Sequence, residues 1–176
     1  MKTKKQYAAL PYIVFETHIE VLLITRRRSK RWIIPKGWPE ADLLPHKLAE
    51  LEAFEEAGLR GQIGKKSLGR FSYVKQLNDN ESVLCDVEVF PLEVSAQYLD
   101  WPEKSQRDLS WLKPDKATAL LEEEDLVSLI LNFSPTKKRS KGNSPAKARS
   151  KDKSKKRSKG KSRNKSRLTG KISATL

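Results

Sequence analysis

The first part of the chain alternates short apolar, β-branched runs with polar turns, a pattern that is typical of strands. Residues 7–15 and 19–25 are two such runs. We expect them to pair, and we expect the second to be buried on both faces because it has almost no polar positions. A basic loop follows at 26–31, and the brief apolar run at 32–34 predicts a third strand that ends at a proline.

Two longer runs later in the chain predict a hairpin. Residues 68–75 and 83–94 alternate or run apolar, and the polar residues between them are typical of a tight turn. Residues 115–121 and 122–133 then read as two helices. Asp115, which follows a proline, is the expected N-terminal cap of the first.

A helix is predicted between Pro45 and Gly58. Proline suits the first turn of a helix because the N–H that it lacks would be unpaired there. Glycine suits the end because it readily adopts the left-handed conformation of a C-terminal cap. The expected apolar stripe of this helix is Leu48, Leu51 and Phe54, and Ala49 and Ala53 would allow close packing.

The order strands, helix, strands, helix predicts an α/β (α+β) fold with a mixed sheet between helices, an α/β/α sandwich. Charge then divides the chain into two parts. Residues 135–176 hold 17 of the 36 Lys and Arg but one of the 22 acidic residues, which leaves residues 1–134 close to neutral. We therefore expect a folded domain over 1–134.

The segment 135–176 is rich in Lys, Arg and Ser and has almost no apolar residues, so we expect a disordered basic tail. Its charge would attract polyanions, and non-specific binding of nucleic acid is one hypothesis for its role. It has no aromatic residue for stacking on bases. Concentrating a phosphorylated substrate, or simply adding solubility, are the alternatives.

One cysteine, Cys85, cannot form a disulfide within the chain, which favours a reducing compartment and the cytoplasm in particular. No apolar run approaches the roughly 20 residues of a membrane span, so we expect no membrane association. The N-terminus has a basic start but no cleavage pattern of small residues, so we expect no signal peptide.

Three carboxylates on the predicted helix are the main candidates for chemistry. Glu52, Glu55 and Glu56 have the spacing i, i+3, i+4, which places them on one helical face. So many acidic groups repel one another unless a cation neutralises them. Hard oxygen ligands suit Mg²⁺ or Mn²⁺. A solvated acidic face is the alternative for such a triplet taken alone.

This helix and the glycine 15 residues before Glu52 resemble the Nudix box. The family pattern has an early glutamate where this chain has Leu43, and an arginine where it has Leu51. That arginine holds the glutamates in the family, so Glu52 needs another means of orientation here. The positions that match the pattern are Gly37, Glu52, Ala53, Glu55, Glu56, Gly58 and Leu59.

The resemblance extends beyond the box, over about residues 7–133. Residues 31–39 and 52–58 are similar to the branch that hydrolyses diphosphoinositol polyphosphates and diadenosine polyphosphates. So are residues 101–103, together with Arg107 ahead of a tryptophan. The resemblance implies a Nudix fold and a metal-dependent hydrolase that splits a phosphoanhydride bond of a phosphorylated small molecule by water attack.

The same resemblance implies roles for the three glutamates. Glu52 and Glu56 would hold Mg²⁺ or Mn²⁺, and Glu55 would be a further ligand or the proton acceptor. All three are thus candidate catalytic residues. A non-catalytic module of the same fold, which binds nucleic acid through the basic tail, is the alternative function, and the departures Leu43 and Leu51 are its only support.

Cations near the box are candidates for binding phosphate, although a basic loop is equally explained as soluble surface. Arg27 and Arg31 are favoured because they match basic positions of the polyphosphate branch. Lys36 lies beside them, and Gly37 would let the backbone approach a phosphate closely or would simply serve a turn. The remaining cations of this group are Arg26, Arg28 and Lys30.

Other residues are weaker candidates. Trp38 is placed to line a substrate cleft, and Glu103 and Arg107 could reach the site from a distant loop. The other two tryptophans considered, at 101 and 111, are expected to pack. The two histidines, at 18 and 46, are too far apart to predict a zinc site with the lone cysteine.

Overall fold

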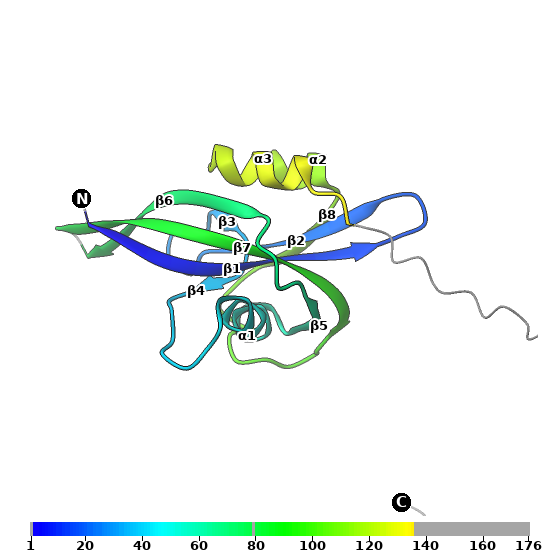
Figure 1. Ribbon diagram of the computed structural model, residues 1–176, viewed down its shortest axis with the longest axis horizontal. Coiled ribbons are helices and arrows are strands. Elements are labelled where there is room, and N and C mark those ends of the chain that lie inside the picture. Colours follow the sequence, from blue (N-terminus) through cyan, green and yellow to red (C-terminus); the bar gives the residue numbers. More distant parts are fainter. Residues whose placement is uncertain (1, 79, 136–176) are drawn as a thin grey trace, which may run out of the picture. The chain divides into compact units, whose positions relative to one another are not determined.

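The computed structural model describes residues 2–78 and 80–135. The fold is a single mixed sheet with helices on both faces, as predicted (Figure 1). The strands are β1 (Thr3–Val14), β2 (Ile19–Thr25), β3 (Trp32–Ile33), β4 (Lys36–Gly37), β5 (Leu59–Ile63), β6 (Gly69–Asn78), β7 (Glu81–Gln97) and β8 (Leu109–Leu112). The helices are α1 (Pro45–Ala57), α2 (Pro114–Thr118) and α3 (Glu124–Asn132).

Strand β1 lies at the centre of the sheet. It pairs antiparallel with β2 and with β4, and parallel with β7, so the sheet is mixed. The strand order along the main path is β3-β2-β1-β7-β5, with β6 on β7 and β8 on β2. Strand β4 and the residue after it lie close to β6: the Nζ of Lys36 is 5.3 Å from the ring centroid of Tyr73, and the Nζ of Lys75 is 4.7 Å from that of Trp38.

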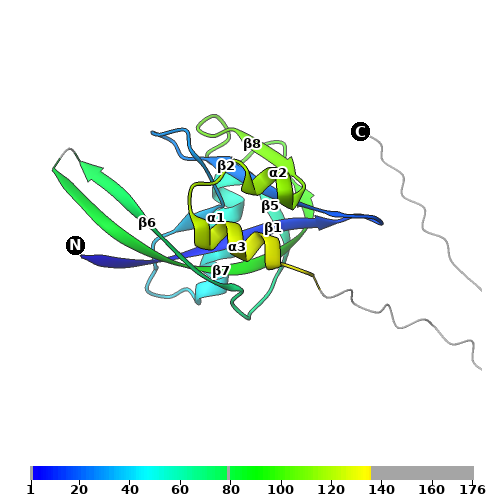
Figure 2. The same cartoon turned by 90° about the horizontal axis from the view of Figure 1, so that it is seen from above.

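Helix α1 covers one face of the sheet, and α2 and α3 cover the other (Figures 1 and 2). Buried aliphatic side chains of β1, β2 and β7 form the core between these layers. The core is continued by Leu126 and Ile130 of α3 on one side and by the alanines of α1 on the other. The alanines are small, which lets α1 lie close to the central strand.

The predicted helix is confirmed at both ends. Pro45 occupies its first turn, and Gly58 ends it with φ +70°, the left-handed conformation that favours glycine. The predicted apolar stripe is wrong, because Leu51 and Phe54 are only half-buried. The buried residues of α1 are Leu48, Ala49, Ala53, Glu56 and Ala57. The buried alanines, Ala49, Ala53 and Ala57, recur every four residues, whereas the predicted stripe recurs every three.

The predicted strand pair and the hairpin are confirmed, although β6 and β7 are longer than expected and β1 begins four residues earlier. Strands β4, β5 and β8 were not predicted. Helix α2 is shorter than expected and begins at Pro114. Asp115 lies in its first turn and makes no capping hydrogen bond, because the N-cap position is Lys113 and its backbone is extended. Asp115 as a cap is therefore wrong.

One sequence prediction falls almost wholly outside the described residues. The basic segment, predicted to be disordered, is described only at its first position, Pro135. The domain boundary at 134 stays a prediction. Among the described residues no helix is long and apolar enough to cross a membrane.

Candidate active site

A cleft of about 710 Å³ lies between α1, the loop after β2, strands β4 and β6, and the segment that precedes β8. Its size is in the usual range for small-molecule sites. All seven residues predicted as catalytic, metal-binding or substrate-binding line this cleft, and their roles stay predictions. They are Arg27, Arg31, Lys36, Gly37, Glu52, Glu55 and Glu56.

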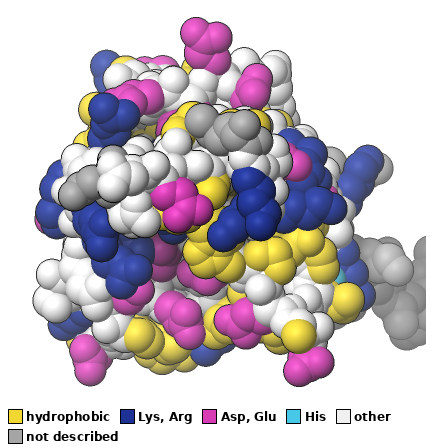
Figure 3. All heavy atoms as spheres, turned by 90° about the vertical axis from the view of Figure 1, so that its left-hand side faces the viewer, with side chains coloured by type: hydrophobic (Ala, Val, Ile, Leu, Met, Phe, Trp, Pro, Cys, Tyr) yellow, Lys and Arg dark blue, Asp and Glu magenta, His cyan; other side chains and the backbone are white. Residues whose placement is uncertain are grey.

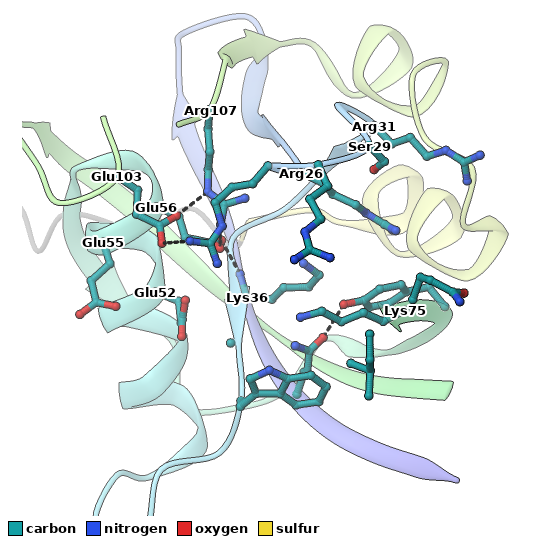
Figure 4. Close-up of a pocket in the computed structure, with 18 of the residues that line it drawn as sticks. Arg26, Ser29, Arg31, Lys36, Glu52, Glu55, Glu56, Lys75, Glu103 and Arg107 are labelled. Atoms are coloured by element: carbon teal, nitrogen blue, oxygen red, sulfur yellow. Dashed lines mark hydrogen bonds and ion pairs between the residues drawn. The ribbon is translucent and has the colours of Figure 1, made fainter. Parts of the chain in front are cut away.

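Charge in the cleft is separated by sign. The carboxylates come from α1 and from the segment before β8, and, apart from Arg107, which lies among them, the cations come from β4, β6 and the loop after β2 (Figure 4). A space-filling view of one face of the domain shows basic and acidic side chains bordering one another beside exposed hydrophobic side chains (Figure 3). Such a site offers one side to a metal cation and the other to phosphate groups.

Glu56 is the most buried of the three box glutamates, and both of its oxygens are engaged. The Lys36 backbone N–H donates to Oε2 at 3.0 Å, and the Arg107 guanidinium is paired with Oε1. The two side chains of the Arg107–Glu56 pair are only 6% and 7% exposed. Burial raises the pKa of Glu56, while the positive charges of Lys36 and Arg107 act in the opposite direction.

Arg107 connects three parts of the cleft. Besides its pair with Glu56, its Nε donates to Glu103 Oε2 at 2.8 Å, and its Nη1 donates to the Thr25 carbonyl at 3.1 Å. It therefore supplies the guanidinium that position 51 lacks, from a residue 51 positions away in the sequence. The sequence indicated that Arg107 could reach the site but not that it would bind a box glutamate.

Glu52 lies directly against the backbone of β4. A Cβ atom built on Gly37 would stand 1.5 Å from Glu52 Oε1, so no side chain other than hydrogen fits at position 37 while Glu52 keeps this position. Gly37 has an ordinary backbone conformation. The absence of a side chain thus allows the Glu52 carboxylate to approach closely, and the predicted contact of Gly37 with phosphate stays a prediction.

The charge of Glu52 is poorly compensated. Burial, followed by the negative charges of Glu56, Glu55 and Glu103, raises the pKa of Glu52 to about 7. Hard oxygen donors with excess negative charge suit a divalent cation, so the donor chemistry fits Mg²⁺ or Mn²⁺. As they stand, no three acidic, histidine or cysteine side chains of the described residues are grouped closely enough to hold an ion.

Arg27 and Arg31 already have acidic partners. Arg27 lies 3.4 Å from Glu103 Oε1, and its Nη1 donates to Gln106 Oε1 at 3.2 Å. Arg31 pairs with Glu122 at 2.6 Å, where both side chains are exposed. The two predicted phosphate-binding arginines thus line the cleft, but a phosphate would compete with Glu103 and Glu122 for their guanidinium groups.

Several cleft residues were not identified from the sequence. Lys75 of β6 contributes its side chain beside Trp38, with its Nζ 4.7 Å from the ring centroid. Tyr73 of the same strand donates its hydroxyl to Gln6 Oε1 at 2.7 Å. The alternation of buried and exposed positions along β6 is the sequence signal that would have placed Lys75 and Tyr73 on one inward face.

Trp38, Glu103 and Arg107 line the cleft as the sequence suggested, whereas Trp101 and the two histidines do not. The ring of Trp101 lies against Gly58, so a Cβ there would stand 2.8 Å from it. His18 stacks on Phe15, and His46 lies beside Phe90. Neither histidine lines the cleft.

Comparison with known proteins identifies relatives that are similar in sequence. Diphosphoinositol polyphosphate phosphohydrolase 3-beta of Bos taurus is 33% identical over 145 residues, which cover 77% of this chain and 84% of that protein. Nudix hydrolase 21, chloroplastic, of Arabidopsis thaliana is 37% identical over 103 residues. Those residues are 58% of this chain and 50% of the plant protein, so the chain spans about half the length of that relative.

Solved structures agree on the fold. The Ap4A hydrolase of C. elegans superposes with a TM-score of 0.54 at 16% identity, and covers 73% of this chain and 94% of that one. The NUDIX domain of Shewanella oneidensis NrtR, in complex with ADP ribose, has a TM-score of 0.54 at 14% identity over 73% and 86% of the two chains. No protein-family model matches the chain. The sequence relatives, the fold and the glutamate helix together establish that the chain belongs to the Nudix hydrolase family.

Proposed function

We propose that the chain is a metal-dependent pyrophosphohydrolase that cleaves a phosphoanhydride bond in a nucleoside- or inositol-type polyphosphate. The main support is the arrangement of the cleft, in which the three box glutamates face a set of cations. Family membership adds support, because the relatives include a diphosphoinositol polyphosphate phosphohydrolase and structural neighbours include an Ap4A hydrolase.

In this reaction the oxygen of water bonds to phosphorus and the bridging P–O bond breaks, which leaves two phosphate-bearing products and releases the protons of water to a base or to solvent. Glu52, Glu55 and Glu56 would hold Mg²⁺, with Mn²⁺ as the alternative ion. When bound, the ion would neutralise charge on phosphate oxygens and polarise the attacking water.

The protein groups have separable tasks. Glu56 is held in place by Arg107 and by the Lys36 backbone N–H, so its carboxylate is preorganised. The Glu55 carboxylate has no hydrogen-bond or ion-pair partner among the described side chains, and it is therefore the better placed of the two to accept a proton. Arg27, Arg31, Lys36 and Gly37 are the proposed contacts to the phosphates.

The test is phosphate release from a panel that contains diadenosine polyphosphates, diphosphoinositol polyphosphates and ADP-ribose, with Mg²⁺ or Mn²⁺. Glu55→Gln and Glu56→Gln should each lower the rate about 10²- to 10⁴-fold. Glu50→Gln is the matched control, because Glu50 lies on the same helix but pairs with Lys47 outside the cleft. A wild-type protein that releases no phosphate from any member of the panel would refute the proposal.

The alternative, a non-catalytic module that binds nucleic acid through its basic tail, has no support from the described residues. The proposed compartment is the cytoplasm, which suits the single buried and unpaired Cys85. Several relatives from Arabidopsis thaliana are named as chloroplastic or mitochondrial proteins.

A further inference from the structure

Thr25, the last residue of β2, is a buried polar residue that the proposed chemistry does not use. It is 3% exposed, and the two residues before it in the strand, Leu23 and Ile24, are fully buried. A buried hydroxyl costs free energy unless it is hydrogen-bonded, and valine offers a similar shape without that cost. The hydroxyl at this position is therefore best explained by the hydrogen bonds that it makes.

All the polar atoms of Thr25 contact the two residues that precede β8. Its backbone N–H donates to the Asp108 carbonyl at 2.9 Å, and its hydroxyl oxygen accepts the Asp108 backbone N–H at 2.9 Å. The hydroxyl also lies 3.4 Å from Asp108 Oδ2. The Thr25 carbonyl accepts a hydrogen bond from Arg107 Nη1 at 3.1 Å. Thr25 therefore holds the backbone directly after Arg107 as well as the guanidinium itself.

The segment that carries Arg107 depends on such contacts for its position. Residues 102–106 form consecutive turns, and β8 begins only at Leu109, so Arg107 lies in neither a helix nor a strand. Nearer the start of the segment, the Glu103 backbone N–H donates to the Glu55 carbonyl at 3.1 Å. These backbone contacts join the segment to α1 at Glu103 and to β2 at Thr25.

Thr25 also precedes the basic loop after β2. Arg26 and Arg27, which line the cleft, are the next two residues along the chain. One residue thus connects the loop on the cation side of the cleft with the segment that brings Arg107 to the carboxylate side (Figure 4). Displacement of a catalytic group by about 1 Å can lower a rate strongly, so this connection matters for the reaction.

We propose that Thr25 is a positioning residue for hydrolysis, which acts through Arg107 on the Glu56 carboxylate. Its hydroxyl fixes the backbone at Asp108, and this sets where the Arg107 guanidinium meets Glu56. Thr25 itself does not line the cleft. The inference rests on the proposed function, because it assigns Thr25 to the reaction of the box glutamates.

The first experiment compares Thr25→Val, which removes the hydroxyl, with Thr25→Ser, which keeps it. Rates are measured with the compound of the panel that wild-type protein hydrolyses fastest. Thr25→Val should lower kcat about 10- to 100-fold, as for other residues that orient a ligand through a hydrogen bond, and should leave KM nearly unchanged. Thr25→Ser should retain most of the wild-type kcat.

The matched control is Thr118→Val. The Thr118 hydroxyl donates to the Pro114 carbonyl at 2.9 Å within α2, and Thr118 does not line the cleft. This variant removes a hydroxyl that is bonded to backbone but has no contact with Arg107. Equal kcat values for Thr25→Val and Thr118→Val would overturn the positioning role, and so would a Thr25→Ser variant as slow as Thr25→Val.

The second experiment needs neither metal nor substrate. The Arg107 Nε–H donates to Glu103 Oε2 at 2.8 Å, and its signal in the NMR spectrum of isotope-labelled protein is assigned by its loss in Arg107→Lys. Thr25→Val should shift or broaden this signal, whereas Thr25→Ser and Thr118→Val should leave it in place. An unchanged signal in Thr25→Val would overturn the positioning role.

A further variant covers the case in which Thr25→Val does not yield folded protein. Thr25→Cys then takes its place in both experiments, because a thiol is only a weak acceptor for the Asp108 N–H. The same results are expected, and the same outcomes would overturn the positioning role.

The two proposals can fail separately. If wild-type protein cleaves no compound of the panel, the proposed function fails, and the Arg107 signal still decides whether Thr25 positions the guanidinium. If wild-type protein cleaves its substrate and Thr25→Val matches Thr118→Val in kcat and in the Arg107 signal, the positioning role fails and the proposed function stands.

Discussion

At the scale of single residues, the buried ion pair between Arg107 and Glu56 dominates the site. Removing one partner of such a pair leaves a charge without compensation in a shielded place. Arg107→Leu should therefore lower the free energy of unfolding by about 3–5 kcal/mol, measured by urea denaturation. The control is Arg31→Leu, which breaks an exposed pair with Glu122 and should cost less than about 1 kcal/mol.

The double variant Arg107→Leu/Glu56→Gln should recover much of this loss, because it also removes the carboxylate that was left unpaired. If Arg107→Leu and Arg31→Leu cost the same, the pair with Glu56 has no special weight. Hydrolysis should be lost in Arg107→Leu in any case, since Glu56 is no longer held.

A second residue-scale prediction concerns Gly37. Gly37→Ala should move Glu52, because the new Cβ would occupy the place of Oε1, and a flexible carboxylate can shift at little cost to stability. Affinity for Mn²⁺ should fall about 10- to 100-fold, measured by calorimetry, as for other residues that position metal ligands. Unchanged Mn²⁺ affinity would contradict the proposed contact.

Gly61→Ala is the contrasting variant. A Cβ at Gly61 would stand 2.0 Å from the backbone oxygen of Glu93 in β7, and backbone cannot move aside as a side chain can. This variant should lose stability by about 1–3 kcal/mol or more without any contact to the cleft. The pair of glycine variants thus separates an effect on the site from an effect on the fold.

How much of the site the sequence predicts also depends on single residues. The glutamates were predictable because a helix places i, i+3 and i+4 on one face whatever surrounds it. The pair between Arg107 and Glu56 was not, because it joins residues 51 positions apart and depends on how the segment before β8 returns to α1. Local patterns carry no information on such a contact.

At the scale of elements, α1 concentrates carboxylates whose charge is opposed by burial. The pKa of Glu52 is raised to about 7 from an ordinary value of 4.5, so the folded state binds its proton more tightly than the unfolded state does. This contribution to stability is complete below pH 4.5 and is lost as the pH rises to about 7. The metal-free protein should therefore melt at lower temperature at pH 7.5 than at pH 5.

Glu52→Gln isolates this effect, since glutamine does not titrate. Melting temperatures of both proteins are measured by circular dichroism without metal. The value for wild type minus the value for Glu52→Gln should decrease as the pH rises from 4.5 to about 7. A difference that is constant with pH would contradict the raised pKa. Saturating Mg²⁺ should raise the melting temperature of the wild type at pH 7.5.

Elements with local signals were predicted, and elements that depend on partners were not. Pro45 and Gly58 fix the ends of α1 by their own backbone preferences. Strands β4 and β8 are two and four residues long, and their extended conformation follows from pairing with β1 and β2. The apolar stripe of α1 was predicted incorrectly for the same reason: the side of α1 that is buried depends on its packing partner, β1.

At the scale of the whole molecule, every residue that lines the cleft and every buried core residue among those described precedes residue 131. A fragment of residues 1–135 should therefore melt at the temperature of the full chain, measured by circular dichroism. A fragment that ends at residue 121 should be destabilised, because it lacks Leu126 and Ile130 of α3. Loss of folding in the longer fragment would contradict the predicted domain boundary.

The fragment 1–135 also tests the hypothesis that the basic segment binds nucleic acid. Retention of the full chain on immobilised RNA should fall steeply with salt, as expected when lysines and arginines neutralise phosphates. The fragment should elute at lower salt. Equal elution of the two proteins would end this hypothesis and leave a solubilising role or the concentration of substrate.

The long-range contact of Arg107 has a consequence for how members of this family are identified. A contiguous motif treats each position as if its chemistry had to be supplied locally, so Leu51 counts as a defect. In the three-dimensional arrangement a guanidinium from the segment before β8 pairs with a box glutamate, although position 51 has none. Chains that have lost one motif residue can therefore be sorted into intact and degenerate enzymes by asking whether a distant side chain restores the missing charge.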